Sequence, residues 1–258
     1  MSEALKAGPK SVVILGLGPS LSQFIEITKR LGDRHQYADE VWGINAVGGV
    51  LQCDRIFHMD DVRIQEIRAK DKPNSNIGAM LKWMKTHHGP IITSRKHPDY
   101  PGLIDFPLEK ALNMFGFAYW NNTAAYAVTY AIMLGVEKLS LFGCDYTYPN
   151  ASDAEAGRAC VEFWLGQAGA RGIRLVMPKA TSLMDSIMEQ SARLYGYDMV
   201  DVELSAPDKK GNVKVIMTEI AALPTAEEIE ARYDHSAHPN PIVRMKQKGE
   251  SKDDDEKV

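Results

Sequence analysis

The stretch "VVILGLGPSLSQFIEITKRL" (residues 12–31) decides the fold class of this chain. Its first four residues are apolar and form a run short enough for a buried strand. Gly16, Gly18 and Pro19 then break the pattern, and an amphipathic helix begins near Ser20. A strand, a glycine turn and a helix in this order can present a helix N-terminus to a phosphate group. The alternative is a tight turn with Ser20 as an ordinary N-cap.

The rest of the chain repeats this alternation of strand and helix. We expect further strands at residues 40–45, 55–60, 90–94, 138–143 and 173–178. We expect helices at residues 20–31, 64–70, 77–87, 123–134, 154–170 and 181–194. Short apolar strands separated by helices predict an α/β fold with a Rossmann-like, mainly parallel, doubly wound sheet.

The character of the sequence changes beyond residue 195. "YDMVDVELS" and "NVKVIMTEI" flank "APDKKG", which predicts a β-hairpin with Gly211 in its turn. A helix is expected at residues 225–233, with Thr225 and Glu228 forming a capping box. The predicted organisation is a nucleotide-binding transferase domain (1–195), a hairpin and helix appendage (196–243) and a disordered charged tail (244–258).

The composition is that of an ordinary packed domain. The chain has 258 residues, is 45% hydrophobic and carries a net charge of -4, which speaks against a broad polyanion-binding surface. No run approaches the roughly 18 apolar residues of a membrane span, and the N-terminus lacks the apolar core of a secretory signal. Cys53, Cys144 and Cys160 form no CxxC pair. These features predict a cytoplasmic protein without a membrane span.

Amide, hydroxyl, carboxylate and phenol groups recur where the expected strands end or the expected helices begin. These residues are Asn45, Asp60, Asp61, Asn121, Asn122, Thr123, Asp145, Tyr146 and Tyr148. Each could separately be a turn or capping residue. Because parallel strands bring their carboxyl ends to one edge of a sheet, we expect Asn45, Asn122 and Asp145 to share one pocket.

These side chains suit the binding of a nucleotide better than that of a metal. Asparagine amides can bond a base edge or ribose hydroxyls, and tyrosine hydroxyls can donate to a phosphate oxygen. The chain reads Met59-Asp60-Asp61-Val62, so a DxD metal clamp is absent and no divalent ion is inferred. The glycine loop also lacks the lysine of an ATP-hydrolysing loop.

Three segments together resemble a superfamily of nucleotide-dependent transferases. They are "VVILGLGPSL", "WGIN" and "NNTAAYAVTYAIMLGVEKLSLFGCDY", within residues 12–177. The superfamily includes bacterial CMP-sialic-acid sialyltransferases, motility-associated glycosyltransferases and archaeal pterin diphosphokinase-like proteins. The resemblance implies inverting glycosyl transfer from a CMP-linked sugar, with no required metal or other cofactor; a UDP-linked or other nucleotide sugar is an equal alternative donor.

The resemblance also implies roles for individual residues. It places Gly16, Gly18, Pro19 and Ser20 on the phosphate side of the nucleotide, and Asn45 at the ribose or phosphate. It places Asn121, Asn122 and Thr123 beside the nucleotide, and Asp145 either at the nucleotide or as a brace for its loop. Tyr146 and Tyr148 correspond to tyrosines that stabilise the departing phosphate.

The chain departs from this pattern at the general base. The sialyltransferases use a histidine downstream of the G-x-D-x-Y segment, whereas residues 138–233 contain no histidine. The substitutes are Asp153, Glu155 and Glu162, or, at another strand end, His58, Asp60 and Asp61. Diphosphate transfer to a hydroxymethyl heterocycle, and nucleotide binding without catalysis, are the alternative functions.

The acceptor is open from the sequence: a glycan, a nucleic acid or a small molecule. A basic stretch around residues 90–94 is either solvated loop charge or a contact for an anionic acceptor; it comprises Lys82, Lys85, Arg95, Lys96 and His97. Association into a homo-oligomer is also open.

Overall fold

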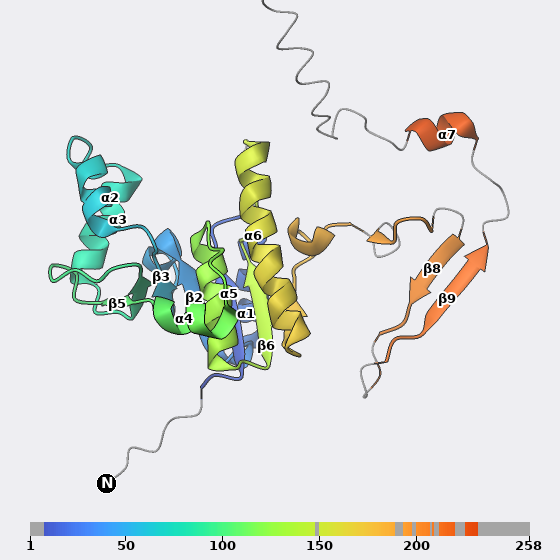
Figure 1. Ribbon diagram of the computed structural model, residues 1–258, viewed down its shortest axis with the longest axis horizontal. Helices are drawn as coiled ribbons and strands as arrows, with labels where there is room; N and C mark the ends of the chain where they lie inside the picture. Colours follow the sequence, from blue (N-terminus) through green and yellow to red (C-terminus); the bar gives the residue numbers. More distant parts are fainter. Residues whose placement is uncertain are drawn as a thin grey trace, which may run out of the picture. The chain divides into compact units, whose positions relative to one another are not determined.

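The computed structural model describes residues 8–147, 150–188, 193–197, 200–206, 208, 212–219 and 225–231 (Figure 1). The chain divides into two compact units, Met1–Glu189 and Gln190–Val258. The separate roles expected for the N-terminal domain and the appendage stay predictions.

The first unit is built on a seven-stranded sheet in which every pair of neighbouring strands is parallel. Its strand order is β5-β4-β3-β2-β1-β6-β7. The strands are β1 (Ser11–Leu15), β2 (Glu40–Ile44), β3 (Arg55–Phe57), β4 (Ile91–Thr93), β5 (Leu103–Asp105), β6 (Lys138–Phe142) and β7 (Arg174–Val176). The order reverses between β1 and β6, which is where ligands bind in open α/β sheets.

Helices lie in most of the connections between these strands. The α-helices are α1 (Leu21–Leu31), α2 (Val62–Ala69), α3 (Asn76–Thr86), α4 (Leu108–Phe115), α5 (Thr123–Leu134) and α6 (Ala151–Ala170). Short 3-10 helices follow α1, β2 and β7: η1 (Arg34–Gln36), η2 (Asn45–Gly49) and η3 (Leu183–Asp185). Within the described ranges, no helix has both the length and the apolar character that a membrane span requires.

The central strand β1 is buried on both faces, which explains its continuous apolar run. Val13 and Leu15 belong to a core with Phe24 of α1, whereas Val12 and Ile14 belong to a core with residues of α5 and α6. Successive side chains of a strand point to opposite faces, so helices must cover both sides of this sheet. The predicted doubly wound parallel fold is therefore confirmed.

The second unit contains an antiparallel hairpin and a short helix. Strand β8 (Val200–Leu204) pairs with β9 (Val215–Glu219), which confirms the predicted hairpin. Helix α7 (Ala226–Ala231) begins after Thr225, whose hydroxyl accepts from the Glu228 N–H at 3.2 Å while the Glu228 carboxylate accepts from the Thr225 N–H at 2.8 Å. The capping box is thus observed. Gly211 and the expected tail at 244–258 lie outside the described residues.

The helix expected at residues 181–194 is wrong. Within residues 181–188 the structure has only the short helix η3, and an α-helix cannot continue there because Met184 and Asp185 have φ of 52° and 51°, in the left-handed region. Ser182 instead donates its hydroxyl to the Asp145 carbonyl at 2.7 Å. The segment therefore packs back against the loop that follows β6.

Strand β5 and helix α4 were not expected from the sequence. β5 has three residues, lies at the edge of the sheet and leaves Ile104 52% exposed, so it carries no apolar run that would reveal it. Its pairing with β4, not its own composition, makes it a strand.

Candidate functional site

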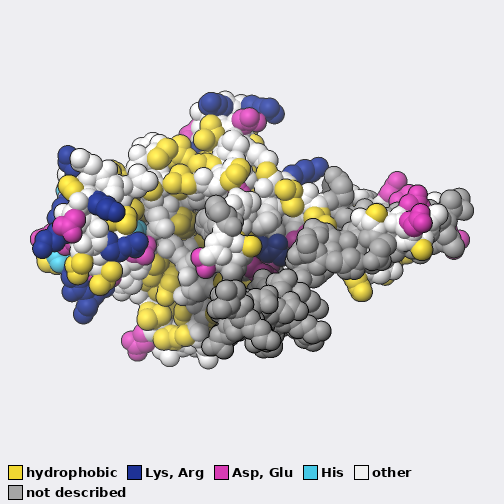
Figure 2. Space-filling view, turned by 90° about the horizontal axis from the view of Figure 1, so that it is seen from above, with side chains coloured by type: hydrophobic (Ala, Val, Ile, Leu, Met, Phe, Trp, Pro, Cys, Tyr) yellow, Lys and Arg dark blue, Asp and Glu magenta, His cyan; other side chains and the backbone are white. Residues whose placement is uncertain are grey.

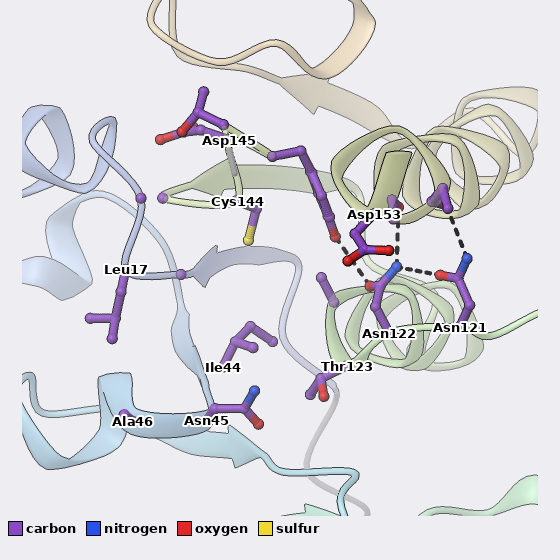
Figure 3. Close-up of a pocket in the computed structure, with 18 residues that line it drawn as sticks. Leu17, Ile44, Asn45, Ala46, Asn121, Asn122, Thr123, Cys144, Asp145 and Asp153 are labelled. Atoms are coloured by element: carbon purple, nitrogen blue, oxygen red, sulfur yellow. Dashed lines mark hydrogen bonds between the residues drawn. The ribbon is translucent and has the colours of Figure 1, made fainter. Parts of the chain in front are cut away.

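A pocket of about 840 Å³ lies in the first unit, where the carboxyl ends of β1, β2 and β6 meet the N-terminal ends of α5 and α6 (Figure 3). It is at the point where the strand order reverses. Its wall is formed by Gly16, Leu17, Gly18, Ile44, Asn45, Ala46, Asn121, Asn122, Thr123, Ala124, Gly143, Cys144, Asp145, Tyr146, Thr147, Asp153, Ala156 and Gly157. Asn45, Asn122 and Asp145, which are distant in sequence, therefore share one pocket as the topology predicted.

Two of the loops in this wall pack directly on each other. The Gly18 N–H donates to the Gly143 carbonyl at 2.7 Å, and Gly143 has a φ of 70°. A Cβ atom at Gly16 would collide with the Gly143 carbonyl oxygen, and one at Gly18 would lie 2.6 Å from the Asp145 carboxylate. The G-x-G pattern is thus needed for contact between loops, whatever it contributes to a ligand.

Ser20 joins the loop after β1 to the loop after β6 through hydrogen bonds. It is fully buried, its N–H donates to Asp145 Oδ2 at 2.7 Å, and its hydroxyl donates to Asp145 Oδ1 at 2.5 Å. The same hydroxyl accepts from the Gly143 N–H at 2.6 Å. The structure gives no support to the expectation that Ser20 faces a phosphate, because its N–H and hydroxyl groups are bonded within the protein. These bonds join Asp145 to the glycine loop, and its contact with a nucleotide stays a prediction.

The N-terminus of α1 is likewise closed to a phosphate. The Leu21 N–H donates to the Gly18 carbonyl at 3.0 Å, and the Ser22 N–H donates to the Pro19 carbonyl at 3.3 Å. Pro19 is not part of the pocket wall. The phosphate site expected at the opening loop lacks free donors at this helix, although Gly16 and Gly18 do line the pocket.

The N-terminus of α5 offers the donors that α1 does not. Asn122 caps this 12-residue helix by accepting from the Ala125 N–H at 3.0 Å. The N–H groups of Thr123 and Ala124 and the Thr123 hydroxyl have no partner among the described residues, and both residues line the pocket. Free N–H groups at the positive end of a helix dipole favour an anion.

The two asparagines before α5 tie it to α6. Asn122 Nδ2 donates to Asn121 Oδ1 at 2.7 Å and to the Gly157 carbonyl at 3.1 Å, and Asn121 Nδ2 donates to the Ala156 carbonyl at 2.9 Å (Figure 3). Their amides are engaged within the protein, so they shape the wall. Direct contact of either residue with a nucleotide stays a prediction.

Tyr146 is held in an uncommon conformation at the pocket. Its φ of 51° lies in the left-handed region, which costs a residue with a Cβ about 1–2 kcal/mol. Its hydroxyl donates to Asn122 Oδ1 at 3.1 Å, and its ring packs on Gly157, where a Cβ would lie 2.6 Å from the ring. Strain of this kind often accompanies function. Tyr148 lies outside the described residues.

Asn45 is the second strained residue of the wall, with a φ of 51°. Its Oδ1 lies 3.1 Å from Nδ1 of His58, which is 1% exposed. A carbonyl oxygen only accepts, so Nδ1 carries the proton and the Asn45 NH₂ group is left for the pocket. Burial lowers the pKa of His58 and a nearby Asp60 opposes this, so the neutral ring is favoured.

The remaining candidate carboxylates differ in whether they line the pocket. Asp60 is exposed and does not line the pocket, and Asp61 caps α2 and pairs with Arg63 at 2.9 Å. The structure thus gives no support to Asp60 as a catalytic residue. Glu162 accepts from the Met184 N–H at 2.6 Å, and Glu155 is not in the wall. Asp153 is in the wall.

The expected basic stretch lies away from the pocket wall. Figure 2 shows Lys and Arg side chains gathered over the part of the molecule that contains α2 and α3. Lys85 there pairs with Glu66 at 3.0 Å, and none of the basic residues lines the pocket.

In the described part of the chain, no group of three or more His, Cys, Asp or Glu side chains is placed to hold a metal ion.

Several wall residues carried no signal in the sequence: Leu17, Ala46, Thr147, Ala156 and Gly157. Cys144 also lines the pocket, and burial together with Asp145 raises the pKa of its thiol to about 12. It therefore stays a thiol at neutral pH. The α6 residues reach the wall only through the packing of α6 on α5, which no local pattern reveals.

Comparison with known proteins finds similar solved structures but assigns the chain to no family. No protein-family model and no curated protein sequence matches the chain. One similar structure is the sialyltransferase CstII from Campylobacter jejuni in complex with the substrate analogue CMP-3FNeuAc. The two sequences are 17% identical, the TM-score is 0.41, and the alignment covers 86% of this chain and 98% of that chain. Another is a mutant of alpha-2,3/8-sialyltransferase CstII, which is 16% identical with a TM-score of 0.39. That alignment covers 86% of this chain and 99% of the mutant's chain. Likeness at this level assigns no activity, so function is argued from the pocket.

Proposed function

We propose that the pocket binds the nucleotide part of a nucleotide sugar and that the protein transfers the sugar to an acceptor hydroxyl. The observation that carries this proposal is the meeting of three strand ends and the free N-terminus of α5 around one pocket of about 840 Å³. That volume is within the usual range for small-molecule sites, roughly 300–1,000 Å³. A CMP- or UDP-linked sugar is the donor class that we propose.

The phosphate of the donor would lie at the start of α5. The N–H groups of Thr123 and Ala124 and the Thr123 hydroxyl would donate to its oxygens, and the Asn45 NH₂ group would donate to a ribose or phosphate oxygen. Negative charge grows on this phosphate as its bond to the sugar breaks. Fixed donors stabilise that charge, and the Tyr146 hydroxyl would join them by exchanging its bond to Asn122 Oδ1 for one to the phosphate.

Calorimetric titration with CMP, UDP and ADP tests the binding part of this proposal. Thr123→Val removes the free hydroxyl at nearly constant shape and should weaken binding of the preferred nucleotide by about 0.5–1.5 kcal/mol. Thr86→Val, which changes an exposed threonine outside the pocket, is the matched control. The absence of binding of any nucleotide would overturn the proposal.

Release of CMP or UDP from nucleotide sugars tests the catalytic part. Steady release, faster with an acceptor hydroxyl present, is the expected result. Release of AMP from ATP with transfer of diphosphate would instead favour the diphosphokinase alternative. Tight nucleotide binding without any turnover would identify a nucleotide-binding protein without catalysis.

A further inference from the structure

An acceptor hydroxyl must lose its proton when it attacks the sugar, so the proposed reaction needs a base in the pocket. We propose that Asp153 is this base; the inference rests on the proposed function and names the residue that completes it. The pocket wall contains four titratable groups: Cys144, Asp145, Tyr146 and Asp153.

Three of the four titratable groups of the wall are already occupied or unsuited. Both carboxylate oxygens of Asp145 accept from Ser20, one from its N–H and the other from its hydroxyl. The Tyr146 hydroxyl donates to Asn122. The Cys144 thiol is buried beside Asp145 and is protonated at neutral pH. Asp153 is the group that remains.

The other candidates do not reach the pocket surface. His58 is almost completely buried and its Nδ1 is used by Asn45. Glu162 pairs with Arg158 at 3.5 Å and accepts from the Met184 N–H. Glu155, on the same helix as Asp153, is exposed but outside the wall. The structure therefore distinguishes Asp153 from substitutes that the sequence alone left equal.

The Asp153 carboxylate is both oriented and accessible. It lies in the first turn of α6, where Asn150 Nδ2 donates to its Oδ2 at 2.7 Å. Its Oδ1 has no partner among the described residues, and the side chain is exposed. Figure 3 shows this carboxylate directed from α6 toward the pocket. A carboxylate oxygen without a hydrogen-bond partner can accept a proton from an acceptor hydroxyl.

The step is balanced without a further reactant. The acceptor oxygen forms a bond to the anomeric carbon while its proton passes to Asp153 Oδ1. The bond between the anomeric carbon and the phosphate oxygen breaks, and its electron pair stays on the departing nucleotide. Protonated Asp153 then returns its proton to water.

The test compares Asp153→Asn with Glu155→Gln, since both remove one negative charge from the first turns of α6 at nearly constant shape. Transfer to an acceptor hydroxyl should fall about 10²- to 10⁴-fold in Asp153→Asn and stay unchanged in Glu155→Gln. Nucleotide binding, measured by calorimetry, should be the same in both variants and in the wild type. Thermal unfolding of each variant checks that α6 is intact.

Azide separates a base from a residue that merely positions the donor. Azide is an anion and needs no base, so wild type and Asp153→Asn should form the glycosyl azide from the nucleotide sugar at similar rates. Wild-type transfer by Asp153→Asn, or equal loss of azide and hydroxyl transfer, would overturn the assignment while the proposed function stands. Failure of the wild type to bind any nucleotide would overturn both.

Discussion

His58 lies directly behind Asn45, with its Nδ1 atom 3.1 Å from the Asn45 side-chain oxygen. The ring follows β3 and the amide follows β2, so two neighbouring strand ends bring them together. Because the histidine uses the amide oxygen, the amide presents its two N–H groups to the pocket. His58 thereby makes Asn45 a donor, which suits a phosphate or ribose oxygen of the ligand.

Loss of this contact should weaken nucleotide binding. His58→Phe keeps a ring but removes the hydrogen bond, and we expect binding to weaken by about 0.5–1.5 kcal/mol, roughly two- to tenfold in Kd. His58→Asn retains an N–H donor near the position of Nδ1 and should restore most of the affinity. Calorimetry with the preferred nucleotide measures both. Equal affinity in wild type and His58→Phe would show that Asn45 is not oriented in this way.

The stability of the fold should decrease as the pH falls below about 6.5. Burial lowers the pKa of His58 from the ordinary 6.5, and burial and His88 lower that of His87. The unfolded chain then binds protons more readily than the folded chain, so stability is greatest above pH 6.5 and is lost toward the lower folded pKa. Thermal unfolding between pH 7.5 and 5.5 should show a smaller pH dependence in His58→Phe. Parallel curves for the two proteins would contradict this.

Ser20→Ala should destabilise the protein although Ser20 contacts no proposed ligand. The change leaves the Gly143 N–H and one Asp145 oxygen buried without their partner, which costs about 1–3 kcal/mol. Ser22→Ala, two residues on, removes an exposed hydroxyl that bonds the Pro19 carbonyl, and should change stability by less than about 0.5 kcal/mol. Denaturant unfolding of both variants gives the comparison. Equal stabilities would show that the Ser20–Asp145 bridge contributes nothing.

A methyl group should have opposite effects at two glycines. Gly16→Ala would drive a Cβ into the Gly143 carbonyl and separate the two loops, so we expect marked destabilisation and weaker nucleotide binding. Gly166, within α6, has open space around a Cβ, and Gly166→Ala should stabilise the helix by about 0.5–1 kcal/mol. Thermal unfolding distinguishes the two. A neutral Gly16→Ala would mean that the loops can separate without cost.

Tyr146→Phe tests whether its hydroxyl acts on the departing phosphate. Removing one donor that is fixed before the reaction typically slows turnover about 10²- to 10³-fold, and we expect a loss of that size with nearly unchanged nucleotide binding. Tyr119→Phe, at a tyrosine that is 40% exposed and outside the pocket wall, is the control. Full turnover in Tyr146→Phe would restrict this residue to packing on Gly157.

The sequence by itself determined the sheet and the place of the pocket. The apolar run at residues 12–15 and its later counterparts have the length of strands buried on both faces, and the intervening stretches have the period of helices. Parallel strands must all end at one edge, so Asn45, Asn122 and Asp145 could be placed in one pocket from local patterns. Strand β5 was not predicted from the sequence because its pairing with β4, rather than its composition, makes it a strand.

Only the tertiary structure decided what each polar side chain of that edge does. Ser20 and Asp145 are 125 residues apart, and nothing in either local stretch shows that their groups bond each other instead of a ligand. The sequence offered both Asp60 and Asp153 as candidates for the base, yet Asp153 lies in the wall and Asp60 does not. The alternation of residues along a strand predicts which face of the sheet each side chain occupies. The hydrogen-bond partner of that side chain depends on chain segments that meet only after folding.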